Sequence, residues 1–258
     1  FKNKIKWELQ QIWKKIDNKS VNKINKKYDL LIIGGGGLFL RDQKGAAKTP
    51  SGWQFNISNQ NLEKIKVPII IFGVGFNKFR GQKNFDERFK KSVRILHKKS
   101  LFFGLRNQGS INNIKKITKL DRFTLQPCVT TLINKIIFCQ KVKQEKLNEI
   151  SFGFAADRLN LRFKNCEKIK YFIKSITLSI KYFKKYKINY VMHKPNDDYF
   201  LKYFDKEIIK KINVVNLSNT SIKNVIKFYK SQKIIFAMRG HNQLISFGCR
   251  RPFFSFIT

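Results

Sequence analysis

Short apolar runs alternate with amphipathic stretches along most of this chain. In its first part, apolar runs end on glycines or polar residues, as buried parallel strands commonly do. The amphipathic stretches between them repeat their apolar positions at helical spacing. The elements expected here are a leading helix over 5–16, strands over 28–33, 67–73 and 100–105, and helices over 85–98 and 110–116.

A polar, Lys-rich stretch at 141–148 interrupts this alternation and reads as a linker. The second part is expected to hold strands over 150–155, 188–192, 214–217, 233–237 and 252–257, and helices over 166–186, 199–212 and 221–229. Such alternation predicts α/β architecture: two Rossmann-like, doubly wound parallel-sheet domains, 1–147 and 148–258, facing a cleft. Because the chain opens without Met and stops on an apolar run, we expect a fragment truncated at its C-terminus.

Composition narrows the class of protein. The 258 residues are 42% hydrophobic, enough for real cores, and carry a formal net charge of +38. The Lys residues are spread along the whole chain, so we expect no specific nucleic-acid binding; the charge favours small anionic substrates and peripheral contact with an anionic membrane. With no signal peptide and no apolar run of transmembrane length, the sequence favours a cytoplasmic protein at the inner face of the membrane.

The four cysteines have no metal-ligand spacing, so we expect reduced thiols and no metal site.

The segment 234–243 carries the strongest chemical signal. An apolar run ends on Arg239, Gly240 and His241. Arg offers a planar donor fork for carboxylate or phosphate, and His can pass a proton near neutral pH. The pattern predicts a site for a small anion that must also be protonated. The alternative is a surface Arg beside a His that caps the strand end.

Other candidates follow the first predicted strands. Gly35 and Gly36 could bring the backbone close to a ligand, or could simply form a tight turn. The loop after them contains Arg41, Asp42 and Trp53. The Trp53 ring could form a platform for a sugar, and its alternative role is a core anchor.

Two further positions could bind or act on a substrate. Arg106 with Ser110 at a helix start could hold an anion, and the alternative is a Ser cap with a solvated Arg. His193 precedes Asp197 and Asp198, which suggests a catalytic pair, a metal site or only a capped turn. Of these, the metal site is the least favoured because no second His lies nearby. No residue order typical of a hydrolase is visible.

In order along the chain, these motifs resemble the polysaccharide pyruvyl transferase family. The matching segments are 29–37 (DLLIIGGGG), 69–75 (IIIFGVG), 106–110 (RNQGS), 126–131 (QPCVTT) and 238–248 (MRGHNQLISFG). The resemblance implies a GT-B-like fold and transfer of a pyruvyl ketal group from phosphoenolpyruvate to a sugar or a lipid-linked oligosaccharide of a cell-surface polysaccharide. It implies no cofactor besides this donor substrate.

The resemblance also distributes roles among the candidates. Catalysis falls to His241 and Arg239, and donor binding to Arg106, Ser110, Arg239 and Asn242. Acceptor binding falls to a larger set: Gly35, Gly36, Arg41, Asp42, Trp53, His193 and Asp197. Two rival readings stay open, a GT-B-type glycosyltransferase that uses a nucleotide sugar and a non-enzymatic basic module that binds nucleic acid or an anionic membrane.

Overall fold

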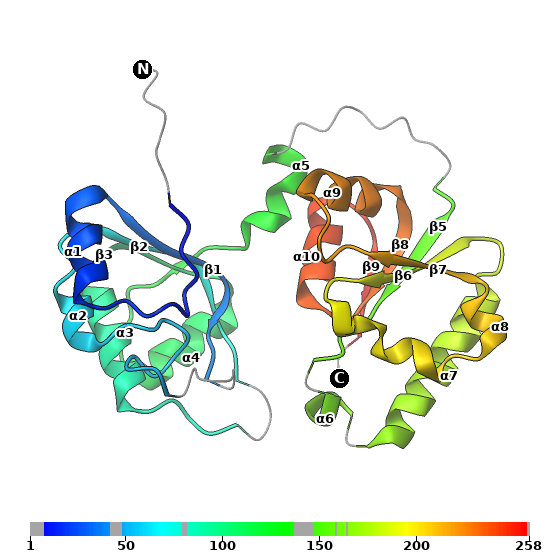
Figure 1. Ribbon diagram of the computed structural model, residues 1–258, viewed down its shortest axis with the longest axis horizontal. Helices are drawn as coiled ribbons and strands as arrows, with labels where there is room; N and C mark the ends of the chain where they lie inside the picture. Colours follow the sequence, from blue (N-terminus) through cyan, green and yellow to red (C-terminus); the bar gives the residue numbers. More distant parts are fainter. Residues whose placement is uncertain are drawn as a thin grey trace. The chain divides into compact units, whose positions relative to one another are not determined.

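The computed structural model describes residues 8–41, 48–78, 82–136, 147–157, 159–163 and 165–256. The chain divides into two compact units, Phe1–Cys128 and Val129–Thr258 (Figure 1). We predicted a boundary between residues 147 and 148, and residues 141–146 of the predicted linker lie outside the described part. The division falls earlier because η2 (Val129–Leu132) and α5 (Ile133–Ile136) pack on α10 (Gly240–Gly248) of the second unit.

The first unit is built on a parallel sheet. Its strands are β1 (Leu31–Phe39), β2 (Ile69–Phe76), β3 (Ser100–Leu105) and β4 (Thr124–Leu125), in the spatial order β1-β2-β3-β4. Each neighbouring pair is parallel. The helices are α1 (Asn18–Lys27), α2 (Asn59–Glu63), α3 (Glu87–Lys99) and α4 (Gln108–Thr118). The expected parallel α/β arrangement is confirmed.

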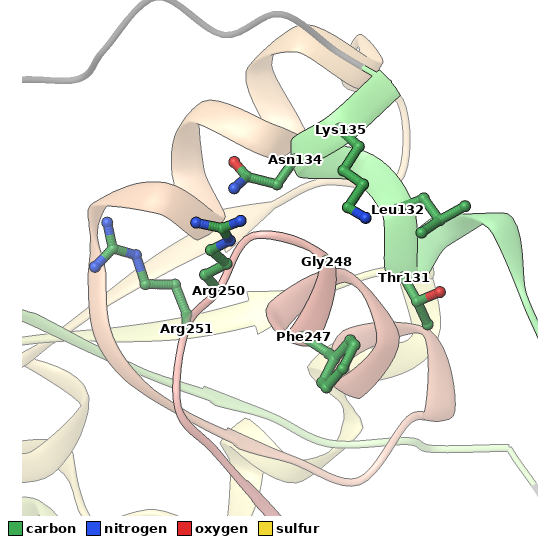
Figure 2. A pocket seen from close by; sticks show the side chains of 8 residues that line it. All are labelled: Thr131, Leu132, Asn134, Lys135, Phe247, Gly248, Arg250 and Arg251. Carbon is green, nitrogen blue, oxygen red and sulfur yellow. The ribbon is translucent and has the colours of Figure 1, made fainter.

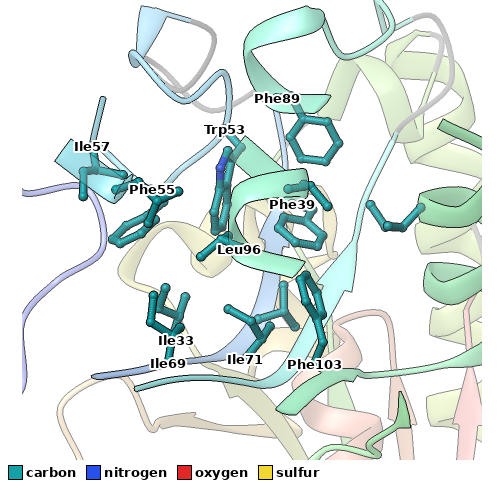
Figure 3. Close-up of a cluster of buried hydrophobic side chains, with 14 of the residues drawn as sticks. Ile33, Phe39, Trp53, Phe55, Ile57, Ile69, Ile71, Phe89, Leu96 and Phe103 are labelled. Carbon is teal, nitrogen blue, oxygen red and sulfur yellow. The ribbon is translucent and has the colours of Figure 1, made fainter. Parts of the chain in front are cut away.

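Aromatic side chains fill the core between this sheet and α3 (Figure 3). The Trp53 ring is fully buried, lies 4.8 Å from the Phe39 ring in an edge-on arrangement, and donates from Nε1 to the Ser92 hydroxyl at 3.0 Å. The expected sugar platform is therefore wrong for Trp53. Its alternative role as a core anchor holds, because no face of the ring is open to a ligand.

The second unit holds a five-stranded parallel sheet with helices on both faces. Its strands are β5 (Glu149–Gly153), β6 (Lys187–Met192), β7 (Ile212–Asn216), β8 (Gln232–Ala237) and β9 (Phe253–Ser255), in the order β7-β6-β5-β8-β9. The helical elements are α6 (Leu159–Arg162), α7 (Cys166–Tyr182), η3 (Pro195–Tyr203), α8 (Lys206–Ile209), α9 (Ile222–Ser231) and α10.

Alternating side chains of these strands pack in two separate cores, one on each face of the sheet. Tyr190 on β6 packs in the core that α7 covers, whereas the next residue, Val191, packs with α9 and α10. The period of two along a strand sends successive side chains to opposite faces. This unit is therefore doubly wound, as predicted.

Three expected elements differ from the structure. Residues 8–16 of the expected leading helix are mostly irregular, with a turn at 12–14 and a bridge from Ile16 to Ile57. The helix begins instead at Asn18, where the Asp17 side chain accepts from the Ser20 amide. The expected helix over 199–212 is divided into η3 and α8, after which β7 begins at Ile212. The first strand does not stop at the glycines but runs through them to Phe39, with a register shift after Gly36. Among the helices that the structure describes, none combines the length and the hydrophobicity that a membrane span requires.

Candidate functional site

Arg239 lies at the carboxyl end of β8, where its guanidinium is held between two carboxylates. Nε donates to Asp197 Oδ2 at 2.9 Å, Nη2 contacts Asp197 Oδ1, and Nη1 lies 2.9 Å from Asp157 Oδ1. Arg162 also pairs with Asp157, at 3.8 Å. Only 12% of the Arg239 side chain is exposed. Two arginines and two carboxylates balance, so this cluster offers no net positive charge to a substrate anion.

Asp197 is the centre of this cluster and is fully buried. Besides Arg239, its carboxylate accepts from the backbone amides of His193 at 3.1 Å, Lys194 at 3.0 Å and Ala156 at 3.3 Å. It therefore joins the loops that follow β5, β6 and β8. The predicted acceptor-binding role of Asp197 is contradicted, because every contact of its carboxylate serves the protein itself and none of its surface faces solvent.

The N-terminus of α10 follows Arg239 directly. Arg239 is the N-cap residue, and its side chain makes no hydrogen bond to the first turn. His241, in that first turn, is exposed. Asn242 is buried against Gly153 of β5, where a Cβ would meet its amide nitrogen at 2.1 Å. Glycine is thus required on β5 for α10 to approach the sheet, and the predicted donor contact of Asn242 is contradicted by its burial.

His193 directly follows β6 and is hydrogen-bonded to a buried tyrosine. Its Nε2 lies 2.7 Å from the Tyr229 hydroxyl. Burial and then the positive charge of Arg239 lower the pKa of His193 from 6.5 to about 4. Near pH 7 the imidazole is neutral and weakly basic, so His193 is poorly matched to act as the base of the catalytic pair that the sequence suggested.

Arg106 lies at the carboxyl end of β3 in the first unit. Its guanidinium rests on Gly75, where a Cβ would stand 2.5 Å from Nε. Burial lowers the pKa of Arg106, and its guanidinium makes no hydrogen bond or ion pair with the described residues. Gly35 and Gly36, on β1 of the same sheet, have left-handed φ values of 85° and 90° and open space where a side chain would be. A half-buried cation without an acidic partner is suited to a bound anion.

Ser110 was expected to bind the donor but belongs to the framework. It is buried, its hydroxyl accepts from the Phe76 amide at 2.9 Å, and it donates to Asn107 Oδ1 at 2.8 Å. Asn107 rather than Ser110 is the N-cap of α4. Ser110 thus joins α4 to β2, and its hydroxyl is already paired in both directions.

The remaining predicted residues lie in the loop after β1. Arg41 contacts the Asn84 carbonyl and lies 3.8 Å from Asp86, the N-cap of α3. Asp42 lies outside the described residues. Arg41 therefore helps to hold the start of α3.

Asp157 was missed by sequence reasoning although it completes the cluster around Arg239. It follows β5, and carboxyl ends of parallel strands are where functional side chains gather. Inspection of every polar residue at such a position would have found it. Within the second unit, the structure thus brings together Arg239, Asp197, His193 and the unpredicted Asp157 next to the start of α10, where His241 is exposed.

Comparison with known proteins identifies the family of this chain and, separately, its fold. The family model for polysaccharide pyruvyl transferase matches residues 1–258. No curated protein matches the sequence. The fold is similar to UDP-GlcNAc 2-epimerase from Methanocaldococcus jannaschii (15% identity, TM-score 0.56, covering 91% of this chain and 64% of that one). It is also similar to a putative UDP-N-acetylglucosamine 2-epimerase from Listeria monocytogenes (12%, 0.57, 97% and 64%) and to S. aureus MnaA in complex with UDP (13%, 0.53, 95% and 63%).

These structural similarities establish a GT-B-like fold and nothing finer, because the identities are low. The chain spans slightly less than two thirds of the length of each of these three structures.

Removing the buried carboxylate of Asp197 should destabilise the second unit. In Asp197→Ala, the Arg239 guanidinium and three backbone amides lose their acceptor, and breaking one side of a buried pair costs about 3–5 kcal/mol. Urea unfolding followed by circular dichroism measures the loss. The matched control is Glu207→Ala, whose pairing with Lys210 at 3.7 Å is exposed, and which should leave stability unchanged. Equal losses in the two variants would contradict the central role of Asp197.

The buried His193 should make stability depend on pH. The unfolded chain binds a proton at this residue below pH 6.5, whereas the folded chain does so only near pH 4. The free energy of unfolding should therefore fall as the pH falls through this window, by roughly 1–2 kcal/mol between pH 7 and pH 5. His193→Gln should remove this part of the slope. Urea unfolding of both proteins at the two pH values tests it, and identical pH slopes would show that His193 is not the group responsible.

Proposed function

The chain belongs to the polysaccharide pyruvyl transferase family, and we propose that it transfers a pyruvyl ketal group from phosphoenolpyruvate to two hydroxyls of a sugar in a cell-surface polysaccharide or its precursor. The family match over the whole chain carries this proposal. The exposed imidazole at the start of α10 supports it. We further propose a cytoplasmic location and an acceptor that is free or lipid-linked.

The reaction has four chemical steps. The methylene carbon of the donor must be protonated, and a sugar hydroxyl must attack the adjacent carbon. Inorganic phosphate then leaves, and a second hydroxyl attacks the same carbon to close the ketal. The two hydroxyl protons are released, and one proton has been added to the former methylene. The protein must therefore supply a general acid and cations for a donor that carries both phosphate and carboxylate.

His241 is assigned the role of general acid. Its position in the first turn of a helix, without burial, allows a substrate to approach the imidazole. The positive end of the helix dipole favours a negatively charged donor at the same place.

Arg239 is assigned a positioning role in place of the direct donor contact expected from sequence. Its guanidinium is engaged with Asp157 and Asp197, and its backbone is the N-cap of α10. Fixing the side chain therefore fixes the backbone from which His241 follows two residues later. Precise placement of an acid contributes to rate because a small displacement lengthens the proton-transfer distance.

Arg106 remains the proposed residue for one anionic group of the donor. Its support is a half-buried guanidinium that has no acidic partner among the described residues. Gly35 and Gly36 remain proposed backbone contacts of the acceptor, since nothing in the described structure covers them.

Binding of phosphoenolpyruvate should depend on Arg106. Calorimetry at moderate salt should show saturable binding by the wild type and loss of binding in Arg106→Ala, because the variant lacks the unpaired cation. Arg94→Ala removes an exposed Arg from α3 and should bind normally. UDP-GlcNAc is the competing ligand: binding of it without any response to phosphoenolpyruvate would replace the proposal with a nucleotide-sugar transferase.

Turnover should depend on His241. Once an acceptor is found, His241→Ala should lower kcat by roughly a hundredfold, the contribution of a positioned general acid. Release of inorganic phosphate from phosphoenolpyruvate measures the rate, and His97→Gln on α3 is the control. Near-normal turnover of His241→Ala, with its circular dichroism spectrum unchanged, would remove His241 from the mechanism.

A further inference from the structure

A second polar site lies at the opposite end of α10 from His241. It is a hollow of about 280 Å³ where η2 and α5 meet the end of this helix (Figure 2). In Figure 2, Asn134 and Lys135 come from α5, and Arg250 and Arg251 come from the loop after α10. We call this site the arginine hollow. Its lining is completed by Thr131, Leu132, Phe247 and Gly248.

The charges around the arginine hollow have one sign. Lys135, Arg250 and Arg251 line it, and no acidic residue does. Within the described part of the chain, none of these three cations has an ion pair or a side-chain hydrogen bond. The Nε of Arg251 is also buried without an acceptor. A buried charged donor without a partner is costly, so this geometry favours a bound acceptor.

Capping of the helix end does not account for the two arginines. The backbone itself satisfies the last turn of α10: the Arg250 amide donates to the Phe247 carbonyl and the Arg251 amide to the Ser246 carbonyl, both at 2.9 Å. This is a Schellman motif, in which glycine usually occupies the left-handed position. Here Arg250 occupies it, with φ 55°. Because the backbone amides cap the helix, the guanidinium groups of Arg250 and Arg251 are not used for capping. Arg250 also keeps a side chain at a position where glycine would be easier to accommodate.

The residue type adds to this argument. The chain contains 43 Lys and only 11 Arg, so Lys is its ordinary surface cation. Several of the arginines serve specific pairs, among them Arg88 with Asp86 and Arg239 with Asp197. The guanidinium fork binds two oxygens of a phosphate at once, which an ammonium cannot do. Two adjacent arginines without acidic partners therefore indicate oxyanion recognition.

We propose that the arginine hollow binds a phosphate-type oxyanion, with Arg250 and Arg251 as bidentate donors and Lys135 as a third cation. The group can come from free phosphate or from the headgroup of an anionic lipid. The exposed Leu132 and Phe247 beside the cations would suit the lipid source, because apolar side chains next to basic ones favour the membrane interface. The proposal is independent of the donor chemistry at His241.

A site-resolved titration tests the proposal directly. In ¹H–¹⁵N spectra of the full chain titrated with inorganic phosphate, the Nε–H resonances of Arg250 and Arg251 should shift saturably, while that of the exposed Arg94 should not. Because each resonance reports its own side chain, phosphate bound elsewhere cannot imitate the result. Uniform shifts of all Arg resonances would overturn the proposal by showing general charge attraction, a real alternative at a net charge of +38.

Matched variants test the affinity. Arg250→Gln/Arg251→Gln should weaken phosphate binding at the hollow by at least about tenfold, because the bidentate contacts are lost. The affinity is read from the shift of the Arg250–Arg251 backbone amides, which the variant retains. Lys223→Gln/Lys227→Gln removes the same charge from the exposed face of α9 and should leave it within twofold. Equal losses of phosphate affinity in the two variants would overturn the proposal. If the arginine variant does not fold, Lys135→Gln, which removes the third cation, takes its place in this comparison.

Vesicles distinguish the two sources of phosphate. The same proteins are sedimented with vesicles of phosphatidylcholine, with and without phosphatidylglycerol. Cosedimentation that requires phosphatidylglycerol and is lost in the arginine variant, but not in the α9 variant, identifies a lipid headgroup. Binding of free phosphate without cosedimentation identifies a soluble ligand. Failure to bind in either form overturns the proposal.

Discussion

The ion pair between Asp197 and Arg239 is the interaction on which the second unit depends most. A fully buried carboxylate would be strongly unfavourable alone, but this one accepts from a guanidinium and from three backbone amides. Those donors come from the loops that follow three neighbouring strands. One side chain thus fixes the carboxyl edge of the sheet and the point at which α10 begins.

The residues that hold the site in place are therefore different from the residue proposed to carry out its chemistry. Arg239 and Asp197 use their charges on each other, and Asp157 and Arg162 complete a balanced cluster. His193 is kept neutral beside Tyr229. His241 is left exposed in the first turn of α10, and a helix holds such a group in a defined orientation toward a substrate. The positive charge that could bind an anion lies at other arginines, Arg106, Arg250 and Arg251, which have no acidic partner among the described residues.

Local patterns predicted most of the strands but only some of the helices. The apolar runs of β2, β3, β5, β6 and β8 are long enough to be read directly. Helix α1 was missed because its polar sequence has few apolar positions, and its start is set by the Asp17 cap and by burial of Val21. The stretch from 199 to 212 has helical spacing, yet its packing on the sheet divides it into η3 and α8. In the second place, packing against distant residues outweighed local periodicity.

The sequence by itself determined the parallel α/β architecture, the family, and the placement of Arg239 and His241 at a strand end, because these follow from local periodicity and ordered motifs. Tertiary structure alone decided which polar residues are available for chemistry. Trp53, Ser110, Asp197 and Asn242 look similar to site residues in sequence, yet each is buried. Their partners or neighbours, such as Ser92, Phe76, Ala156 and Gly153, lie far along the chain. Burial and pairing are properties of residues distant in sequence, and a linear pattern contains no record of them.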